Sequence, residues 1–285
     1  MNAPASPVAE FKPLTAPLRD LSAWISYFRQ AEIPILARTA DELEAMRANE
    51  DNVDANMIGE MVADDPLMTL KALAYMSTHR PERLVTDVET VTGAVLVMGI
   101  SPFFNAFGPQ PTIEDRLAHD DEALQGLYRV IRRAHRAARF ALAFAIHRQD
   151  HDAAVIYEAA LLHDFGEMLL WCHAPALALK IRAMQRADST LRSNVAQQDV
   201  LNVKLLELQQ ALMKSWRLPE LLIRITDDSH PEHPSVRNVM LAMRLARHTA
   251  DSWDNAAIPD DVKDIAELLN LSLEATMTFV QELER

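Results

Sequence analysis

A histidine and an aspartate stand side by side in the apolar stretch EAALLHDFGEMLLW, which spans residues 158–171. His163 and Asp164 are costly to bury unless a partner satisfies them. A neutral imidazole and a carboxylate are also ligands for divalent metals, and a bound metal makes water a stronger nucleophile by lowering its pKa. The pair is therefore a candidate metal site for phosphoryl hydrolysis. The alternative is a hydrogen-bonded contact with a purely structural role.

Further candidate ligands lie on both sides of the pair. Upstream, His135 lies in the helix-like segment of residues 126–148, at the edge of its apolar face. The downstream segment ITDDSHPEHP contains the other candidates, which are Asp227, Asp228, His230 and His233. We predict that His135 approaches His163 and Asp164 between two antiparallel helices, because only a short link, residues 149–151, separates the two segments.

Arginines recur along the same upstream segment. Alanines and larger apolar residues share one helical face, and the opposite face carries Arg129, Arg132, Arg133, Arg136 and Arg139. This pattern favours a solvated helix face. The alternative is a docking strip for an acidic partner or an anionic ligand.

The composition favours a mostly helical protein. The chain has 285 residues and is 49% hydrophobic, which is enough for one large core or two modest ones. Glycine is scarce, and apolar residues recur with a period of about 3.6. No convincing stretch alternates with period two between turn signals. We therefore predict an all-α fold with little or no sheet.

The periodicity and the capping residues predict helices through nearly the whole chain. Asp65 can cap the helix that Pro66 opens. The expected helices are Leu18–Gln30, Ala40–Asn49, Ala55–Ala63, Pro66–Thr78, Asp87–Met98, Glu122–Arg148, Asp152–Cys172, Pro175–Ala187, Val195–Trp216, Pro219–Asp228, Pro234–Asp251, Asp260–Leu269 and Leu273–Glu284.

Charge and cysteine content restrict the partners and the compartment. The net charge of −13 disfavours binding to nucleic acid or to an anionic membrane surface. The longest apolar stretch, residues 90–104, is too short to span a bilayer. The single cysteine, Cys172, excludes an internal disulfide and fits a reducing cytoplasm. We expect an inert, partly buried Cys172 beside an exposed His173.

Several segments resemble a known family. ALLHDFGEMLL resembles the central motif of the HD superfamily of metal-dependent phosphohydrolases. IPILARTADEL, MIGEMVADDPLMTLKALAYMST and VETVTGAVLVMGISPFFN resemble the first half of one branch, the HDOD domain, and AHRAARFALAFA, the His-Asp stretch and KSWRLPELLIRI follow in the expected order. The resemblance covers roughly residues 18–250. It implies an all-α domain that is often used in bacterial signalling and is generally non-catalytic.

The chain departs from the catalytic relatives at positions that matter for chemistry. Met243 stands where those enzymes carry a late aspartate, and a thioether is a poor ligand for a hard cation. Glu167 stands where HDIGK-like sequences carry a lysine, and its charge would repel a phosphate. Ser229 precedes His230 where the family has a double-histidine turn. Asp227 or Asp228 could replace a missing ligand only along a changed backbone path.

The resemblance and the composition together define the expected organisation. Residues 1–17, rich in proline and alanine, are expected to form a flexible leader. Residues 18–250 are expected to form an HD-like domain of two packed lobes, at about 18–115 and 116–250. Residues 251–285 are expected to add a C-terminal helical extension.

The function implied is regulatory. We expect a signal-transduction or scaffolding protein of the bacterial cytoplasm that binds a protein partner, and neither nucleic acid nor membrane. His135, His163, Asp164 and His230 are the expected vestigial metal ligands, with no catalytic residue and no cofactor beyond at most one weakly held divalent metal. The alternative is a metal-dependent phosphohydrolase or phosphodiesterase that acts on a nucleotide or a cyclic dinucleotide.

Overall fold

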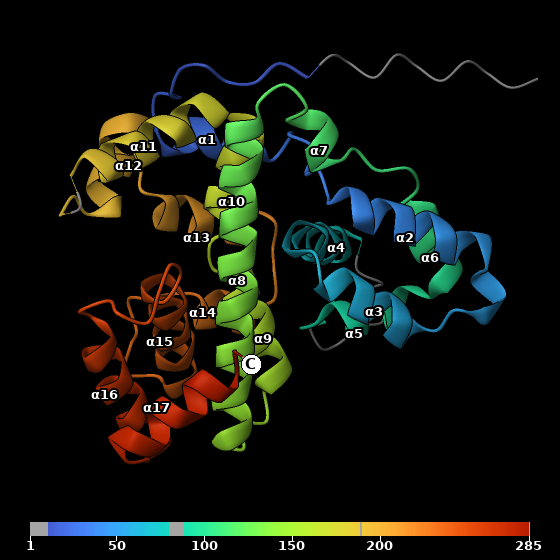
Figure 1. The fold of residues 1–285 in the computed structure, drawn as a ribbon. Coiled ribbons are helices and arrows are strands. Elements are labelled where there is room, and N and C mark those ends of the chain that lie inside the picture. The colour runs from blue at the N-terminus through green and yellow to red at the C-terminus, as the bar shows by residue number, and fades with distance from the viewer. Residues whose placement is uncertain (1–10, 80–87, 189, 285) are drawn as a thin grey trace, which may run out of the picture.

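The computed structural model describes residues 11–79, 88–188 and 190–284, and it is built from helices (Figure 1). Helices hold 70% of the described residues, about twice the average share for globular proteins. No strand occurs in these residues, and one isolated bridge joins Ile35 to Thr112. The predicted all-α fold is therefore confirmed. No helix among the described residues has both the length and the apolar character needed to cross a membrane.

The first helices are short. Asp65 caps α4 as predicted, because its carboxylate accepts the backbone N–H groups of Leu67 and Met68 at 2.9 and 3.0 Å. The expected start of a helix at Asp87 lies outside the described residues. The bounds are α1 Leu21–Phe28, α2 Ala37–Ala48, α3 Ala55–Ala63, α4 Pro66–Thr78, α5 Val91–Met98, α6 Ile100–Ala106 and α7 Ile113–Arg116, with a 3₁₀ turn at Glu50–Asn52.

The second half of the chain begins with the longest helix and continues with shorter ones. Their bounds are α8 Asp121–His147, α9 Ala153–Leu162, α10 Phe165–His173, α11 Pro175–Ala187, α12 Ser193–Leu201, α13 Leu205–Ser215, α14 Glu220–Ile225, α15 Pro234–His248, α16 Ile258–Leu269 and α17 Leu273–Glu282.

Two of the expected helices are interrupted. The sequence predicts one helix over Asp152–Cys172, but Asp164 has a non-helical ψ of 22° and separates α9 from α10. The helix expected over Val195–Trp216 ends at Asn202, whose φ of 64° is left-handed and divides α12 from α13. The first break places the His-Asp pair at a helix junction, where Asp164 reaches Arg133 on α8 and His163 reaches Asp228 in the turn after α14.

Helix α8 forms the central axis of the molecule (Figure 1). Helices α2–α6 lie on one side of it, and α14–α17 lie on the other. Most of its alanines, among them Ala134, Ala137 and Ala141, are fully buried and allow α9 and α15 to pack closely. Asn238 on α15 donates from Nδ2 to the carbonyl oxygen of Ala141 at 3.1 Å. This helix can therefore fix the relative positions of several layers.

The N-terminal residues do not all lie with α2–α6. Helix α1, which the sequence analysis assigns to the first lobe, packs against α13. Trp24 on α1 donates from its indole nitrogen to the carbonyl oxygen of Leu201 at 2.9 Å. Residues 1–10 of the expected leader lie outside the described residues. Its later part contacts the body, since Leu14 donates its backbone N–H to the carbonyl oxygen of His173 at 2.8 Å.

The C-terminal extension packs against the arginine face of α8. Arg136 donates from Nε to Glu284 at 2.7 Å and from Nη2 to Thr249 Oγ1 at 2.6 Å. Arg139 donates to the carbonyl oxygen of Leu283. The prediction of a solvated arginine face is wrong for Arg136, whose side chain is 24% exposed, whereas Arg129, Arg132 and Arg139 are exposed as predicted. A sequence pattern cannot show which part of a charged face a later helix will cover.

Candidate functional site

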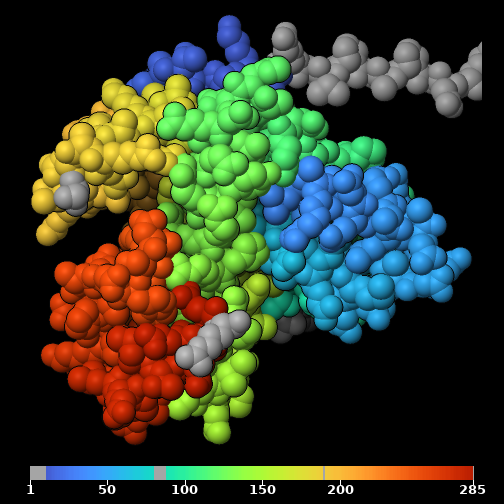
Figure 2. Space-filling view, in the orientation of Figure 1, coloured from blue at the N-terminus to red at the C-terminus, as the bar shows by residue number. Residues whose placement is uncertain are grey.

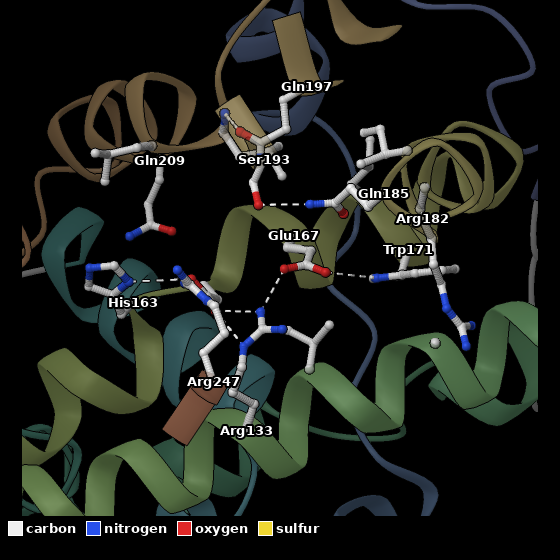
Figure 3. A pocket seen from close by; sticks show the side chains of 18 of the residues that line it. Arg133, His163, Glu167, Trp171, Arg182, Gln185, Ser193, Gln197, Gln209 and Arg247 are labelled. Carbon is white, nitrogen blue, oxygen red and sulfur yellow. Dashed lines mark hydrogen bonds and ion pairs between the residues drawn. The ribbon is translucent and has the colours of Figure 1, made fainter. Parts of the chain in front are cut away.

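A cavity of about 460 Å³ lies beside the His-Asp pair. The space-filling view shows a hollow between the α11–α12 region and the α15 region, next to α8 (Figure 2). Side chains from several helices line the cavity (Figure 3). The charged lining residues are Arg129, Arg133, His163, Asp164, Glu167, Arg182, Asp228 and Arg247.

Arg133 is the centre of an ion network on one wall of this cavity. It reaches from α8 towards the junction between α9 and α10 (Figure 3). Its Nε donates to Asp164 Oδ2 at 2.9 Å, and its Nη2 donates to Glu167 Oε2 at 2.7 Å. Because the guanidinium group carries a permanent positive charge, it offsets one of the two negative charges at these carboxylates.

His163 is held between two aspartates. Its Nδ1 lies 3.3 Å from Asp164 Oδ1, and its Nε2 lies 3.0 Å from Asp228 Oδ1. Burial opposes a charge on the ring, but the carboxylate partners outweigh burial and raise the pKa of His163 to about 9. The imidazole is therefore protonated at neutral pH, and both nitrogens donate hydrogen bonds.

Asp164 carries the matching negative charge. Burial alone would raise the pKa of its carboxyl group, yet Arg133, followed by the hydrogen bond from His163 and the charge of Arg247, holds that pKa well below its usual range. Arg133 and Asp164 are 19% and 14% exposed, so solvent screens their attraction only weakly. The two residues form a buried ion pair that remains charged across the physiological range.

The outer part of the network orients the carboxylates. Trp171 donates from its indole nitrogen to Glu167 Oε1 at 3.4 Å. The backbone N–H of Gly166 faces Gln209 Oε1 at 3.4 Å. A Cβ at position 166 would lie 3.4 Å from the carbonyl oxygen of Leu205, which is ordinary van der Waals contact between α10 and α13.

A family model named HDOD domain matches residues 33–231, well over half of the chain. The chain belongs to the HDOD family. No curated protein sequence matches it.

Solved structures share the HDOD fold at low sequence identity. The MmoQ response regulator of Methylococcus capsulatus is 16% identical, with a TM-score of 0.65 over 88% of this chain and 98% of that chain. A virulence factor of Campylobacter jejuni is 16% identical, with a TM-score of 0.61 over 91% of this chain and 94% of that chain. These likenesses show the fold.

His135 lies away from the His-Asp pair in this HDOD protein. Its half-buried side chain lies near Asp64 and Arg38, and burial is the main cause that lowers the pKa of His135. Positions two apart on an α-helix point about 200° apart, so Arg133, which faces Asp164, leaves His135 on the opposite face of α8. The predicted contact between His135 and His163 is wrong.

The downstream segment contributes Asp228 to the pocket. His230 is exposed, and its Nδ1 lies 3.1 Å from Glu232 Oε1. Asp227 accepts from the backbone N–H and the hydroxyl of Ser229 within the turn. The structure therefore brings together His163, Asp164 and Asp228, whereas His135 and His230 lie outside the network.

The residue pair after the His-Asp stretch also differs from expectation. Cys172 and His173 are both buried, at 0% and 1% exposed, so the prediction of an exposed His173 is wrong. The ring of His173 packs edge-on against Tyr27 and Phe28. Burial, assisted by the charge of Arg116, lowers the pKa of His173 to about 3, and burial raises the pKa of the Cys172 thiol to about 12. Both groups are neutral and structural.

Sequence reasoning missed part of the site. Arg133 was one of five arginines with the same helical spacing, and only its contacts distinguish it. Arg247 lies one turn after Met243 on α15, and Gln209 lies on α13; no local pattern marks either as a pocket residue. Residues that lie near the His-Asp pair but far from it in the sequence can be identified only once the fold is known.

The metal centre of the wider superfamily does not fit these residues. No group of three or more His, Cys, Asp or Glu side chains able to hold a metal occurs in the described part of the chain. Arg133 occupies Asp164 Oδ2, and the lone pairs of His163 are blocked by protons at neutral pH. Met243, at the position of the late carboxylate, is buried and 2% exposed.

Proposed function

We propose that this HDOD protein is a non-catalytic regulator in bacterial signal transduction that acts by binding a protein partner in the cytoplasm. Family membership supports a signalling role, and the MmoQ structure with the same fold is named a response regulator. The observation that carries the non-catalytic part is the pairing of Asp164 with Arg133 and protonated His163. The ligands that a hydrolytic metal would use are already committed to each other.

A metal would have to break this network to bind. It would displace Arg133 from Asp164, which leaves a guanidinium group that is only 19% exposed with Glu167 as its remaining carboxylate partner. It would also have to remove a proton from His163, which costs about 3 kcal/mol at pH 7 for a pKa of about 9. Few remaining groups could offset these costs, since Met243 offers no oxygen ligand. We therefore assign the pair a structural role, with no resident metal and no cofactor.

Metal analysis and hydrolysis assays test this role. The full chain, purified without chelator and without a histidine tag, is expected to contain no stoichiometric divalent metal. With added Mn²⁺, Mg²⁺, Fe²⁺ or Ni²⁺ it is expected to hydrolyse neither nucleoside phosphates nor cyclic dinucleotides nor guanosine tetraphosphate. The control is the doubly substituted protein with His163→Ala and Asp164→Ala. Activity above that control would replace the regulator with a metal-dependent phosphohydrolase.

The partner is proposed to be a protein, and the net charge of −13 argues against a polyanion such as nucleic acid or an anionic membrane. A cross-linked pull-down from extract of the native cells tests this part. The expected result is enrichment of the same protein in repeated captures, reduced by competition with untagged chain. Capture of nucleic acid that is sensitive to nuclease, with no protein enriched, would contradict it.

A further inference from the structure

The far end of the cavity from His163 is cationic and has no carboxylate of its own. Arg129 on α8 and Arg182 on α11 both line the cavity, and neither makes an ion pair with another described residue. In Figure 3 the guanidinium group of Arg182 points from α11 towards α8. Two helices therefore direct positive charge at one space.

The charge of the whole cavity is opposite to that of the protein. Four arginines and protonated His163 face three carboxylates, so positive groups are in excess. The chain as a whole carries a net charge of −13. Because low-dielectric walls concentrate the field of a cleft, this difference favours a small anion over a macromolecular polyanion, which the rest of the surface would repel.

Arg182 is partly buried, and one nitrogen of its guanidinium group lacks a hydrogen-bond partner among the described residues. This atom, Nη1, is itself buried. Burial, and then the nearby charges of Arg129 and Arg186, lower the pKa of Arg182. Glu122 opposes this effect but is the smallest of the four contributions, and an oxyanion between Arg129 and Arg182 would offset the repulsion of these like charges.

A second donor on the cavity wall is also without an acceptor. Gln209 is 2% exposed, and its Nε2 has no partner among the described residues. A buried donor left unpaired is costly, so a polar acceptor on an occupant of the cavity would be stabilising. Apolar wall is available between the polar groups, from Val130, Leu170, Trp171 and Ile181.

We propose that this cavity binds a small organic dianion, a phosphate ester or a dicarboxylate, with its charged group between Arg129 and Arg182 and its apolar part along Trp171. The volume of about 460 Å³ lies within the range of small-molecule sites. Arginine forks match both oxyanions, so the shared feature is two negative charges on a small body. Nothing in this site depends on whether the protein is a catalyst or a regulator.

Calorimetric titration of the full chain tests the site. The probes are phenyl phosphate, phthalate and inorganic phosphate at constant ionic strength, with phenol as the neutral control. We expect saturable binding of phenyl phosphate or phthalate and no detectable binding of phenol. The dianion with the lower Kd identifies the ligand class. Arg129→Gln and Arg182→Gln are each expected to raise its Kd by about tenfold or more, since each removes a charge-assisted contact.

Matched variants separate a built site from general charge attraction. Arg132→Gln on α8 and Lys180→Gln on α11 remove the same charge from exposed positions of the same helices that do not line the cavity, so Kd should stay within about twofold. Arg182→Lys keeps the charge but loses the forked pair of donors, so its Kd should lie between those of the wild-type protein and Arg182→Gln. Equal weakening in all variants, equal binding of phenol, or no saturable binding of any dianion would overturn the site.

The same samples keep this inference separate from the proposed function. If phenyl phosphate binds and no phenol is released, the site and the non-catalytic role both stand. Release of phenol that is lost in the His163→Ala, Asp164→Ala protein would refute the non-catalytic role and leave the anion site in place. Absence of binding would refute the site alone.

Discussion

Glu158 and His163 lie five residues apart at the end of α9 and are almost equally buried, at 6% and 7% exposed. Their surroundings differ sharply. His163 contacts two aspartates, whereas Glu158 accepts one hydrogen bond, from the backbone N–H of Val91 at 2.9 Å, and its Oε2 has no partner among the described residues. At neutral pH His163 is therefore protonated and charged, whereas Glu158 is protonated and uncharged.

The difference shows which effect decides the charge of a buried group. Burial raises the pKa of Glu158 to about 8, against the opposing hydrogen bond from Val91. Val91 begins α5, so its amide also presents the positive end of a helix dipole, but one such donor does not offset desolvation. For His163, two full negative charges do outweigh it. Two hydrogen bonds to oppositely charged groups, rather than one to a neutral backbone amide, keep a buried group ionised.

The largest expected effect is the pH dependence caused by Glu158. Its folded-state pKa of about 8 is raised above the unfolded value, so the folded state binds more protons between about pH 4.5 and 8. The free energy of unfolding should therefore fall as pH rises through this window, by up to about 5 kcal/mol. Glu158→Gln should remove this fall. Urea unfolding from pH 5 to 9 measures the free energy of unfolding. If this free energy depends on pH in the same way in the wild-type protein and in Glu158→Gln, the account is contradicted.

Asp164→Ala probes the paired side of the comparison. It leaves Arg133 with Glu167 alone and takes one of two carboxylates from His163. Because breaking a buried ion pair strands a charge, the free energy of unfolding should fall by about 3–5 kcal/mol at pH 7. The control is Glu232→Ala, an exposed carboxylate that also contacts a histidine. A loss below about 1 kcal/mol in Asp164→Ala would show that the network contributes little.

His163 itself should give a smaller slope at higher pH. Its pKa of about 9 in the folded state exceeds the unfolded value of about 6.5, so its stabilisation is complete below pH 6.5 and is lost as pH rises to 9. The loss amounts to about 3 kcal/mol. Glu158 titrates in an overlapping window, so the measurement compares Glu158→Gln with the double variant Glu158→Gln, His163→Gln. If the free energy of unfolding of both variants changes equally between pH 6.5 and 9, His163 is not protonated in the folded protein.

The fold could be predicted from the sequence far better than the site. Helix periodicity and caps such as Asp65 are local, so the sequence revealed the all-α class and most helix positions. The protonation of His163 depends on Asp228, which is 65 residues away along the chain. The breaks at Asp164 and Asn202 depend on the local backbone angles that packing selects. Residue types that could serve as ligands were visible, but their assembly required the fold.

The histidines illustrate the same limit. His135 and His163 had similar sequence settings, each in an apolar helical segment, yet α8 turns one towards Asp64 and the α9–α10 junction turns the other into the pocket. His173 was expected to be exposed, but Tyr27 and Phe28 on α1, and Phe11 before α1, pack against its ring. Burial by distant segments is the information that a single sequence lacks.

The smallest expected effect is that of His230→Ala. His230 is exposed, and its contact with Glu232 is a surface ion pair, which contributes little to stability. The backbone hydrogen bonds that hold its turn, from His230 N–H to the Asp227 carbonyl and from His233 N–H to the His230 carbonyl, do not need the imidazole. The free energy of unfolding should therefore change by less than about 0.5 kcal/mol. A metal site shared by His163 and His230 predicts something different. In that case Mn²⁺ or Ni²⁺ would raise the melting temperature of the wild-type protein, and either His163→Gln or His230→Ala would abolish the shift. We expect neither metal to produce a shift that depends on His230, because the ion network leaves that residue with no part in the pocket.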